Sequence, residues 1–119
     1  MTRNNKNFGA WGESAATEYL ENKGYQVISR NLHTPYGEID IVAENENSLM
    51  FIEVKTRSNM SYGNPEDSIN LRKLEHMEAS AQYYVQDYEY QGTWQIDVIS
   101  IIKRDTDQIE IVHFENVIT

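Results

Sequence analysis

The sequence has 119 residues, no cysteine and a formal net charge of −9. This length predicts a single domain over residues 1–119, and the absence of cysteine excludes disulfide bonds and thiolate metal sites. The acidic balance argues against a protein that binds nucleic acid through a broad basic surface, although most of the basic residues lie between Arg3 and Lys73. The polar N-terminal stretch and the lack of a long apolar run predict a cytoplasmic protein that does not associate with membranes.

The first predicted element is an amphipathic helix over residues 8–23. Its apolar residues recur at a spacing of three or four, Asn7 is a suitable N-cap, and Gly24 is a suitable stop. A strand with alternating apolar residues follows at 25–30, and turn residues occupy 34–37.

Two further strands are predicted at 38–44 and 49–56, joined by a short turn. A second helix is expected to begin with Asn64 as its N-cap and Pro65 at its first position, and to end at Gly92. Two more strands complete the chain, at 94–102 and 108–114. The order α-β-β-β-α-β-β predicts an α/β fold in which helices flank a mixed central sheet.

Charged residues interrupt the apolar pattern of the predicted hairpin. If residues 46 and 47 form a two-residue turn, Asp40 faces Glu53 and Glu38 faces Lys55. Strand alternation places all four on one face together with two apolar side chains, Val42 and Phe51. The opposite face is predicted to be wholly apolar, with Ile39, Ile41, Ala43, Met50, Ile52 and Val54.

Two interpretations of this charged face are open. Directly opposed carboxylates have Cβ atoms about 4.5–5.5 Å apart and repel one another, so a proton, Lys55 or a metal ion must compensate. Hard divalent cations such as Mg²⁺ prefer oxygen ligands and suit such a pair. The alternative is a solvated polar face with Glu38 and Lys55 as a surface pair. The clustering of the acids at one end, beside two apolar side chains, argues against that alternative.

Several short motifs resemble those of the YraN family of small bacterial proteins. They are "GxxGE" (9–13), "RN" (30–31), "GEIDIVA" (37–43), "FIEVKTR" (51–57), "YGNP" (62–65), Lys73 and "DVI" (97–99). The family is similar in fold to restriction endonucleases and to archaeal Holliday-junction resolvases. The resemblance therefore implies a restriction-endonuclease-like αβββαβ core, with Asp40 and then Glu53-Val54-Lys55 in the place of the PD-(D/E)xK signature.

The resemblance also implies roles for individual residues. Asp40 and Glu53 would hold Mg²⁺ or Mn²⁺ with the Val54 carbonyl as a further ligand, and Lys55 would orient or help deprotonate the attacking water. Glu13, on the first helix, matches a catalytic glutamate of the resolvase-like nucleases, whereas an acid favoured only by the helix dipole is the alternative. The sequence departs from the pattern at two positions, with Ile39 in place of proline and Gln95 where the family often has arginine.

Three basic residues near the signature are candidate phosphate contacts, namely Arg57, Arg72 and Lys73. Lys73 lies on the apolar face of the second helix, so a lysine that only extends its charge to solvent is the alternative. Glu38 is an accessory residue of the charged face. The tyrosines within 83–90 could stack on bases, although such residues more often belong to a core. Asp97 is expected to be structural, and the three scattered histidines form no ligand pattern.

These observations predict a metal-dependent endonuclease that hydrolyses DNA phosphodiesters, with branched or single-stranded DNA as its substrate. A homodimer could span a substrate with two-fold symmetry. The alternative is a non-catalytic module with the nuclease fold that binds nucleic acid or a protein partner. The charged cluster favours the enzyme, whereas the acidic balance favours the module.

Overall fold

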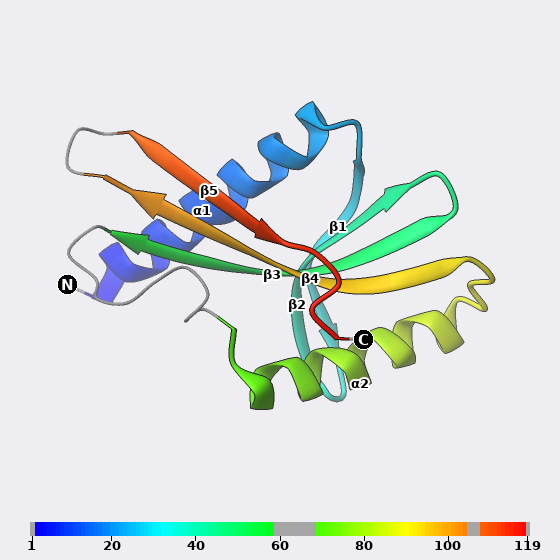
Figure 1. Cartoon of the computed structure of the whole chain (residues 1–119). Helices are drawn as coiled ribbons and strands as arrows, with labels where there is room; N and C mark the ends of the chain where they lie inside the picture. Colours follow the sequence, from blue (N-terminus) through cyan, green and yellow to red (C-terminus); the bar gives the residue numbers. More distant parts are fainter. Residues whose placement is uncertain (1, 59–68, 105–107, 119) are drawn as a thin grey trace.

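The computed structural model describes residues 2–58, 69–104 and 108–118, with side chains from Asn7 onward. The described residues form two helices and five strands (Figure 1). In chain order these are α1 (Thr2–Asn22), β1 (Gln26–Thr34), β2 (Gly37–Asn45), β3 (Ser48–Ser58), α2 (Leu71–Asp87), β4 (Thr93–Lys103) and β5 (Ile109–Phe114).

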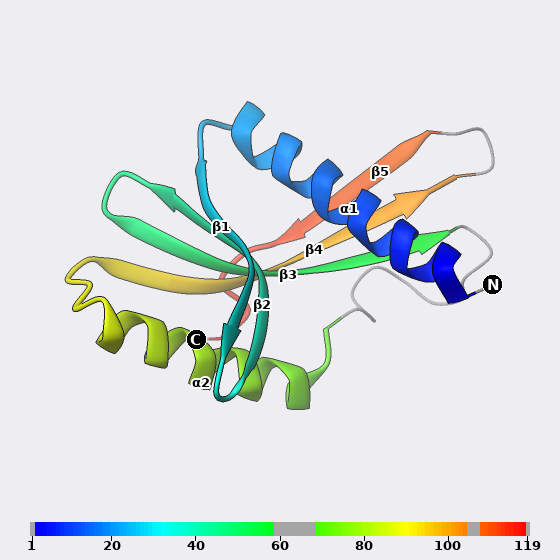
Figure 2. The same cartoon turned by 180° about the vertical axis from the view of Figure 1, so that it is seen from behind.

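The five strands form one mixed sheet in the order β1-β2-β3-β4-β5. Neighbouring strands are antiparallel except β3 and β4, which are parallel. A parallel pair needs a long crossover connection, and the segment that contains α2 provides it. α1 covers one face of the sheet and α2 covers the other (Figures 1 and 2). The predicted α/β fold with an αβββαβ core is confirmed, and β5 extends it at one edge.

Each face of the sheet buries an apolar cluster. The α1 side contains Ala16, Leu20, Ile41, Ala43, Met50, Ile52, Ile99 and Ile101. The α2 side contains Ile39, Val42, Leu49, Phe51, Leu74, Met77, Ala81, Ile96 and Val98. The central strands β3 and β4 supply residues to both clusters because a helix covers each of their faces. Neither described helix combines the length and apolarity that crossing a membrane requires.

α1 begins earlier than the sequence pattern predicts. It starts at Thr2, so Asn7 lies inside the helix and its prediction as the N-cap was wrong. No proline or glycine lies between Thr2 and Asn7 to stop the helix from extending. The predicted end is confirmed. Gly24 adopts a left-handed φ of 94°, and its N–H donates to the carbonyl of Glu21 at 3.0 Å.

α2 is shorter than predicted. Its N-cap is Asn70, whose Oδ1 accepts a hydrogen bond from the backbone N–H of Lys73 at 3.2 Å. The residues 64–65 that were expected to begin this helix lie outside the described residues. The helix ends at Asp87 rather than near Gly92, because Glu89 adopts a left-handed φ of 51° and turns the chain toward β4.

The predicted register between β2 and β3 is confirmed from Asn45–Ser48 to Ile41–Ile52, and the pairing of the two strands stops there. β2 remains paired with β1 as far as the turn at Gly37. The end of this hairpin approaches α2, where the hydroxyls of Thr34 and Ser80 lie 2.7 Å apart. The β1–β2 hairpin therefore separates from β3 and curves toward α2 beyond Ile41.

This separation corrects three predictions. Asp40 does not pair directly with Glu53, because the pairing of the two strands ends one residue earlier. Ile39 packs in the α2-side cluster, whereas strict alternation placed it on the face of Ile41. Glu38 is paired with His33 on β1 rather than with Lys55, because β2 no longer faces β3 at that point. The contact with His33 joins Nδ1 and Oε2 at 3.6 Å.

Candidate active site

A cleft of about 390 Å³ opens where β2 separates from β3. Its charged lining residues are Glu13 from α1, Asp40 from β2, Glu53 and Lys55 from β3, and Lys73 from α2. Phe8, Gly9, Val54 and Thr56 complete the described lining. The fold thus brings together in one hollow all four residues to which the resemblance assigned catalytic roles.

Asp40 is fixed to the neighbouring strand by its own side chain. Its Oδ2 accepts a hydrogen bond from the backbone N–H of Val54 at 2.8 Å. Paired strands would satisfy this N–H with a backbone carbonyl, but the β2–β3 pairing has already ended at Ile41–Ile52. The Asp40 carboxylate therefore takes the place of the backbone carbonyl that would accept from this N–H, and it is held directly beside Glu53.

Glu53 is nearly buried, with 7% of its side chain exposed. Two lysines approach it from different elements: Lys73 Nζ lies 3.5 Å from Oε1, and Lys55 Nζ lies 3.8 Å from Oε2. Both lysine side chains remain about half exposed. Their charges therefore offset the buried carboxylate while still facing the solvent of the cleft.

Glu13 reaches the cleft because α1 lies unusually close to β3. A Cβ atom at Gly12 would lie 1.9 Å from Thr56 Oγ1, so only glycine permits this approach. Arg30 Nη2 lies 3.7 Å from Glu13 Oε1, and the side chain of Asn31 hydrogen-bonds to the same carboxylate. The motifs "GxxGE" and "RN" therefore meet in space and hold Glu13 in place.

Burial raises the pKa of Glu53 and of Asp40; the charge of Asp40 further raises the pKa of Glu53, and the charge of Glu38 further raises that of Asp40. For Glu53, Lys73 and Lys55 oppose the rise. For Asp40, the Val54 N–H opposes it first, followed by the same two lysines. Burial and then Asp40 likewise raise the pKa of Glu13. The charges of Lys55 and Lys73 therefore do not fully offset the burial of these carboxylates, so a further proton or a bound cation would stabilise them.

The donor set fits a hard divalent cation. Asp40 and Glu53 offer carboxylate oxygens in a half-open hollow, and such ions take oxygen ligands and retain several water molecules. Val54 lines the same cleft, so a role for its carbonyl is consistent with its place and stays a prediction.

The remaining predicted site residues differ in whether they line the cleft. Lys73 lines it, whereas Arg57 and Arg72 are not among the described residues that do. Arg57 follows Lys55 by two positions and so shares its face of β3. Glu38 is about half exposed, and its charge further raises the pKa of Asp40, in keeping with an accessory place.

A family model described as "Uncharacterised protein family UPF0102" matches residues 12–101. The chain belongs to the UPF0102 family. This is the YraN family, so the resemblance drawn from the sequence is confirmed. The matched segment of this UPF0102 protein contains all five charged residues of the cleft, from Glu13 to Lys73.

Three relatives illustrate the extent of the similarity. A UPF0102 protein of Syntrophomonas wolfei is 38% identical over 102 residues, which cover 85% of this chain and 89% of the relative. A UPF0102 protein of Syntrophotalea carbinolica is 36% identical over 115 residues, with 96% and 93% covered. A UPF0102 protein of Clostridium botulinum (strain 657) is 44% identical over 81 residues, with 68% and 66% covered.

A second acidic cluster in this UPF0102 protein was not predicted. Asp97, His113 and Glu115 offer ligand atoms within 4.8 Å of one another, a spacing that could hold a metal ion. His113 Nε2, however, already lies 2.7 Å from Asp97 Oδ2, and His113 Nδ1 lies 3.2 Å from the hydroxyl of Tyr19. The other oxygen of Asp97 accepts two hydrogen bonds at 2.9 Å, from Gln95 Nε2 and the Asn116 N–H.

These partners favour the structural role predicted for Asp97, because a metal ion there would have to displace existing bonds. Gln95, at the position where the resemblance led us to expect arginine, donates to Asp97 and is not among the residues that line the cleft. The only sequence signal for the network was a lone acid inside an apolar strand, since His113 is sixteen residues away.

Proposed function

We propose that this UPF0102 protein is a Mg²⁺- or Mn²⁺-dependent endonuclease that hydrolyses DNA phosphodiesters. The observation that carries the proposal is the meeting of Asp40, Glu53 and Lys55 in an open cleft, with Asp40 clamped to the backbone of β3. Both carboxylates line an open cleft, and burial raises their pKa values although two lysines lie beside them. Such groups are typical of functional sites.

The acids of the cleft divide the work of such a reaction. Asp40 and Glu53, with the Val54 carbonyl, would hold the cation. When bound, the cation would lower the pKa of a water molecule and offset charge on the phosphate. Glu13 has a raised pKa, so it is suited to hold a proton and return it to the leaving oxygen.

The lysines have complementary tasks. Lys55 carries three N–H donors and no acceptor, so as an ammonium it orients the attacking water or a phosphate oxygen. Lys73 offsets Glu53 from α2 and, together with Lys55, draws the phosphate into a cleft that also holds three carboxylates. In the net reaction, water oxygen bonds to phosphorus, one phosphorus–oxygen bond breaks, and the leaving oxygen takes up a proton.

The test is an assay of branched, nicked, single-stranded and duplex DNA with Mg²⁺, Mn²⁺ or EDTA. Lys55→Ala should keep DNA and metal binding but reduce cleavage by at least about 10²-fold, because Lys55 acts on the chemical step. Asp40→Asn removes a proposed metal ligand, and Asp87→Asn is its matched surface control. Asp87 is exposed and lies at the far end of α2, about 21 Å along the helix from Lys73. Equal cleavage by wild type and Lys55→Ala at equal DNA occupancy would contradict the role assigned to Lys55.

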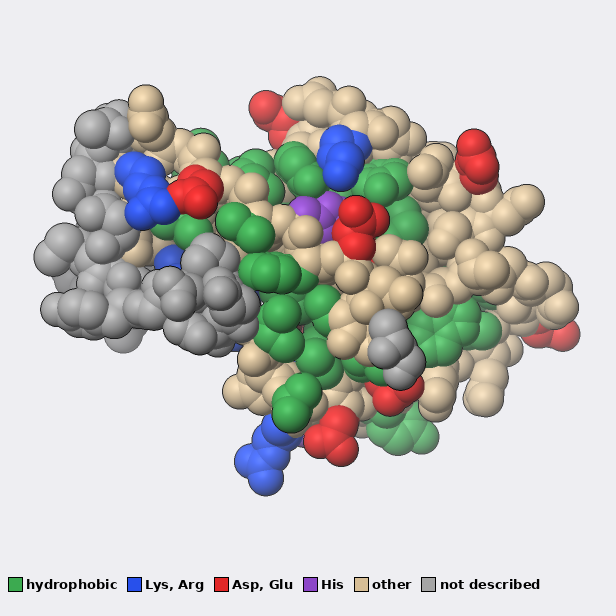
Figure 3. All heavy atoms as spheres, viewed as in Figure 1, with side chains coloured by type: hydrophobic (Ala, Val, Ile, Leu, Met, Phe, Trp, Pro, Cys, Tyr) green, Lys and Arg blue, Asp and Glu red, His purple; other side chains and the backbone are tan. Residues whose placement is uncertain are grey.

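A second candidate is the non-catalytic module, and the charge distribution favours it. The net charge is −9, and on the described part of the face in Figure 3 the Lys and Arg side chains stand apart among acids rather than in a basic tract. Absence of cleavage by the wild type on every substrate, together with retained binding, would favour this candidate. A homodimer remains a prediction that sedimentation of the intact chain would test.

A further inference from the structure

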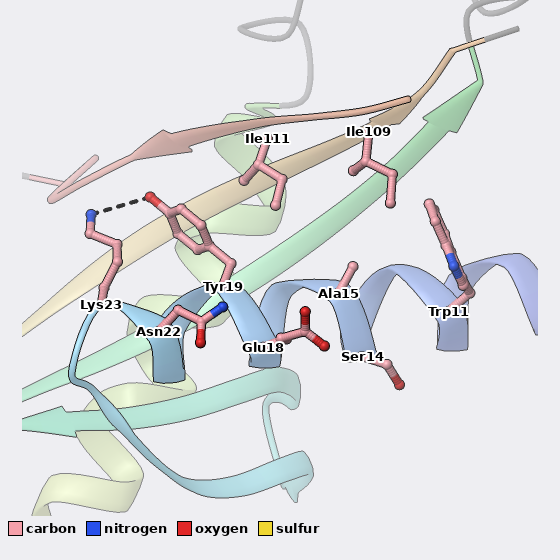
Figure 4. A pocket seen from close by; sticks show the side chains of 9 residues that line it. All are labelled: Trp11, Ser14, Ala15, Glu18, Tyr19, Asn22, Lys23, Ile109 and Ile111. Carbon is pink, nitrogen blue, oxygen red and sulfur yellow. Dashed lines mark hydrogen bonds between the residues drawn. The ribbon is translucent and has the colours of Figure 1, made fainter. Parts of the chain in front are cut away.

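A second groove, of about 490 Å³, lies between α1 and β5 (Figure 4). Trp11 and Tyr19 stand at its two ends on α1, and Ile109 and Ile111 point toward α1 from β5. The hydroxyl of Tyr19 is held between Lys23 Nζ and His113 Nδ1, each at 3.2 Å. This end of the groove is therefore fixed by hydrogen bonds before any ligand arrives.

An aromatic pair connects this groove to the candidate active site. Phe8 lines the cleft of Asp40 and Glu53, whereas Trp11 lines the second groove. The two rings stack with centroids 5.6 Å apart and planes 6° from parallel. An extended ligand that leaves the cleft across Phe8 therefore reaches Trp11 and the groove beyond it.

Cations stand at both ends of the groove. Lys103 Nζ lies 5.8 Å from the centre of the Trp11 ring, and Lys23 Nζ lies 5.1 Å from the centre of the Tyr19 ring. Glu18 lines the groove between these ends and would repel a phosphate there. A ligand that fits this pattern presents negative charge at the ends and flat or apolar surface in the middle.

We propose that this groove binds an unpaired segment of the DNA whose backbone enters the cleft. Its bases would stack on Trp11 and lie against the apolar wall of β5, and its phosphates would lie near Lys103 and Lys23. This inference rests on the proposed function, because the nucleic acid in the cleft is what extends across Phe8. Paired bases already stack on their neighbours and offer no free face, so the groove selects an unpaired strand.

The proposal resolves the conflict between a DNA substrate and a chain with a net charge of −9. Stacking on an aromatic ring gains affinity without a large basic surface. It also narrows the substrate class. The preferred DNA has a flap, tail or branch that supplies a single strand next to the bond in the cleft, and a blunt duplex is bound more weakly.

The chain offers a direct probe because Trp11 and Trp94 are its two tryptophans. Trp94 packs edge-on against Phe51, with centroids 5.8 Å apart, on the α2 side of the sheet. The variant Trp94→Phe therefore leaves Trp11 as the only indole. Titration with an oligothymidylate about eight nucleotides long, within the footprint of single-strand-binding folds, is made in EDTA so that no metal-dependent cleavage occurs.

We expect saturable quenching of Trp11 fluorescence in Trp94→Phe. In anisotropy titrations of a labelled oligothymidylate, Trp11→Ala should weaken binding about tenfold and Trp11→Phe much less, because a ring remains for stacking. Ile109 is 48% exposed, so Ile109→Glu places a charge in the groove without disturbing the core and should also weaken binding. Binding of the oligonucleotide without quenching, and unaffected by Trp11→Ala and Ile109→Glu, would overturn the proposal.

The outcomes separate this inference from the proposed function. If the protein cleaves tailed substrates with metal, and neither Trp11→Ala nor Ile109→Glu changes that cleavage, the proposed endonuclease function is supported and the proposed role of the groove is overturned. Quenching and tail-dependent binding without cleavage support the groove and favour the non-catalytic module. Failure of any DNA to bind the wild type overturns both.

Discussion

The acidic clusters in the cleft and between β4 and β5 differ in how their carboxylates are satisfied. Asp97 accepts hydrogen bonds on both oxygens and is fully buried, with His113 Nε2 at 2.7 Å. Glu53 is almost as buried, yet its ion-pair partners are two half-exposed lysine side chains at 3.5 and 3.8 Å. A buried carboxylate that is fully hydrogen-bonded supports the fold, whereas one that is incompletely compensated can exchange a proton or a cation.

The largest effect that would test this comparison is the loss of metal-dependent cleavage expected when Asp40 is replaced. Asp40→Asn should reduce metal-dependent cleavage by about 10²- to 10³-fold, because the amide cannot supply an anionic ligand or a preorganised charge. The same change should leave the free energy of unfolding in EDTA unchanged or higher, since it removes a poorly compensated buried charge. Calorimetric titration with Mn²⁺ should show weakened binding. Large destabilisation with metal binding intact would assign Asp40 to the fold instead.

At the second cluster, of Asp97 and His113, we expect a substitution to lower stability rather than metal binding. Asp97→Ala leaves the His113 ring, the Gln95 amide and the Asn116 N–H without their buried acceptor. The free energy of unfolding should fall by on the order of 3 kcal/mol, as for other broken buried pairs. Denaturant unfolding measures this loss, and Mn²⁺ titration of the variant under folding conditions supplies the control. Loss of Mn²⁺ binding without loss of stability would make Asp97 a ligand.

The sequence predicted which residues line the cleft better than it predicted how the strands are arranged to form it. Alternation and a two-residue turn placed Asp40 near Glu53, and the family resemblance added Glu13 and Lys73. The sequence pattern could not reveal that β2 leaves β3 beyond Ile41, because that divergence depends on the packing of the β1–β2 hairpin against α2. For the same reason it misplaced Ile39.

The sequence pattern also could not predict contacts between segments that are distant in the chain. The Asp97–His113 network joins β4 to β5, and Tyr19 joins it from α1, so no local spacing announces it. The approach of α1 to β3 at Gly12 is likewise a tertiary contact. Because α1 begins at Thr2, Glu13 lies far from the helix N-terminus, so the helix dipole does not account for it and its place in the cleft does.

The pH dependence of stability should report on the carboxylates of the cleft. The folded pKa values of Asp40 and Glu53 lie above their usual values of 3.8 and 4.5. In the pH window between the usual and the raised values, the folded state binds more protons than the unfolded state. The stability that these two groups contribute without metal should therefore be greatest below the usual values and fall as pH rises through the raised ones.

Mg²⁺ should remove part of that fall, because it stabilises the ionised carboxylates at higher pH and has little effect when they are protonated. Denaturant unfolding as a function of pH, with EDTA or with Mg²⁺, measures both effects. Glu53→Gln should flatten the profile obtained in EDTA. A wild-type profile in EDTA that falls no more steeply across this window than that of Glu53→Gln would contradict the direction of the shift at Glu53.

The smallest expected effect concerns how Glu13 is held. Asn31 adopts a left-handed φ of 54°, which asparagine and glycine tolerate and most residues do not, and its side chain bonds to Glu13. Asn31→Gly keeps this backbone conformation and removes only the hydrogen bond. Cleavage should fall by about threefold to tenfold, as for loss of a single hydrogen bond of ~1 kcal/mol, with little change in stability.

Asn31→Ala is the matched comparison, because it removes the same bond but, unlike Asn31→Gly, keeps a Cβ in the left-handed region. Alanine lacks the local polar contacts that let asparagine adopt this conformation, so it costs about 1–2 kcal/mol relative to glycine. If Asn31 acts by positioning Glu13, both variants should lose the same share of cleavage, and only Asn31→Ala should unfold more easily. With Glu13→Gln as the background, Asn31→Gly should have no further effect on cleavage, because the carboxylate that it holds is gone. An undiminished effect in that background would show that Asn31 acts on the reaction independently of Glu13.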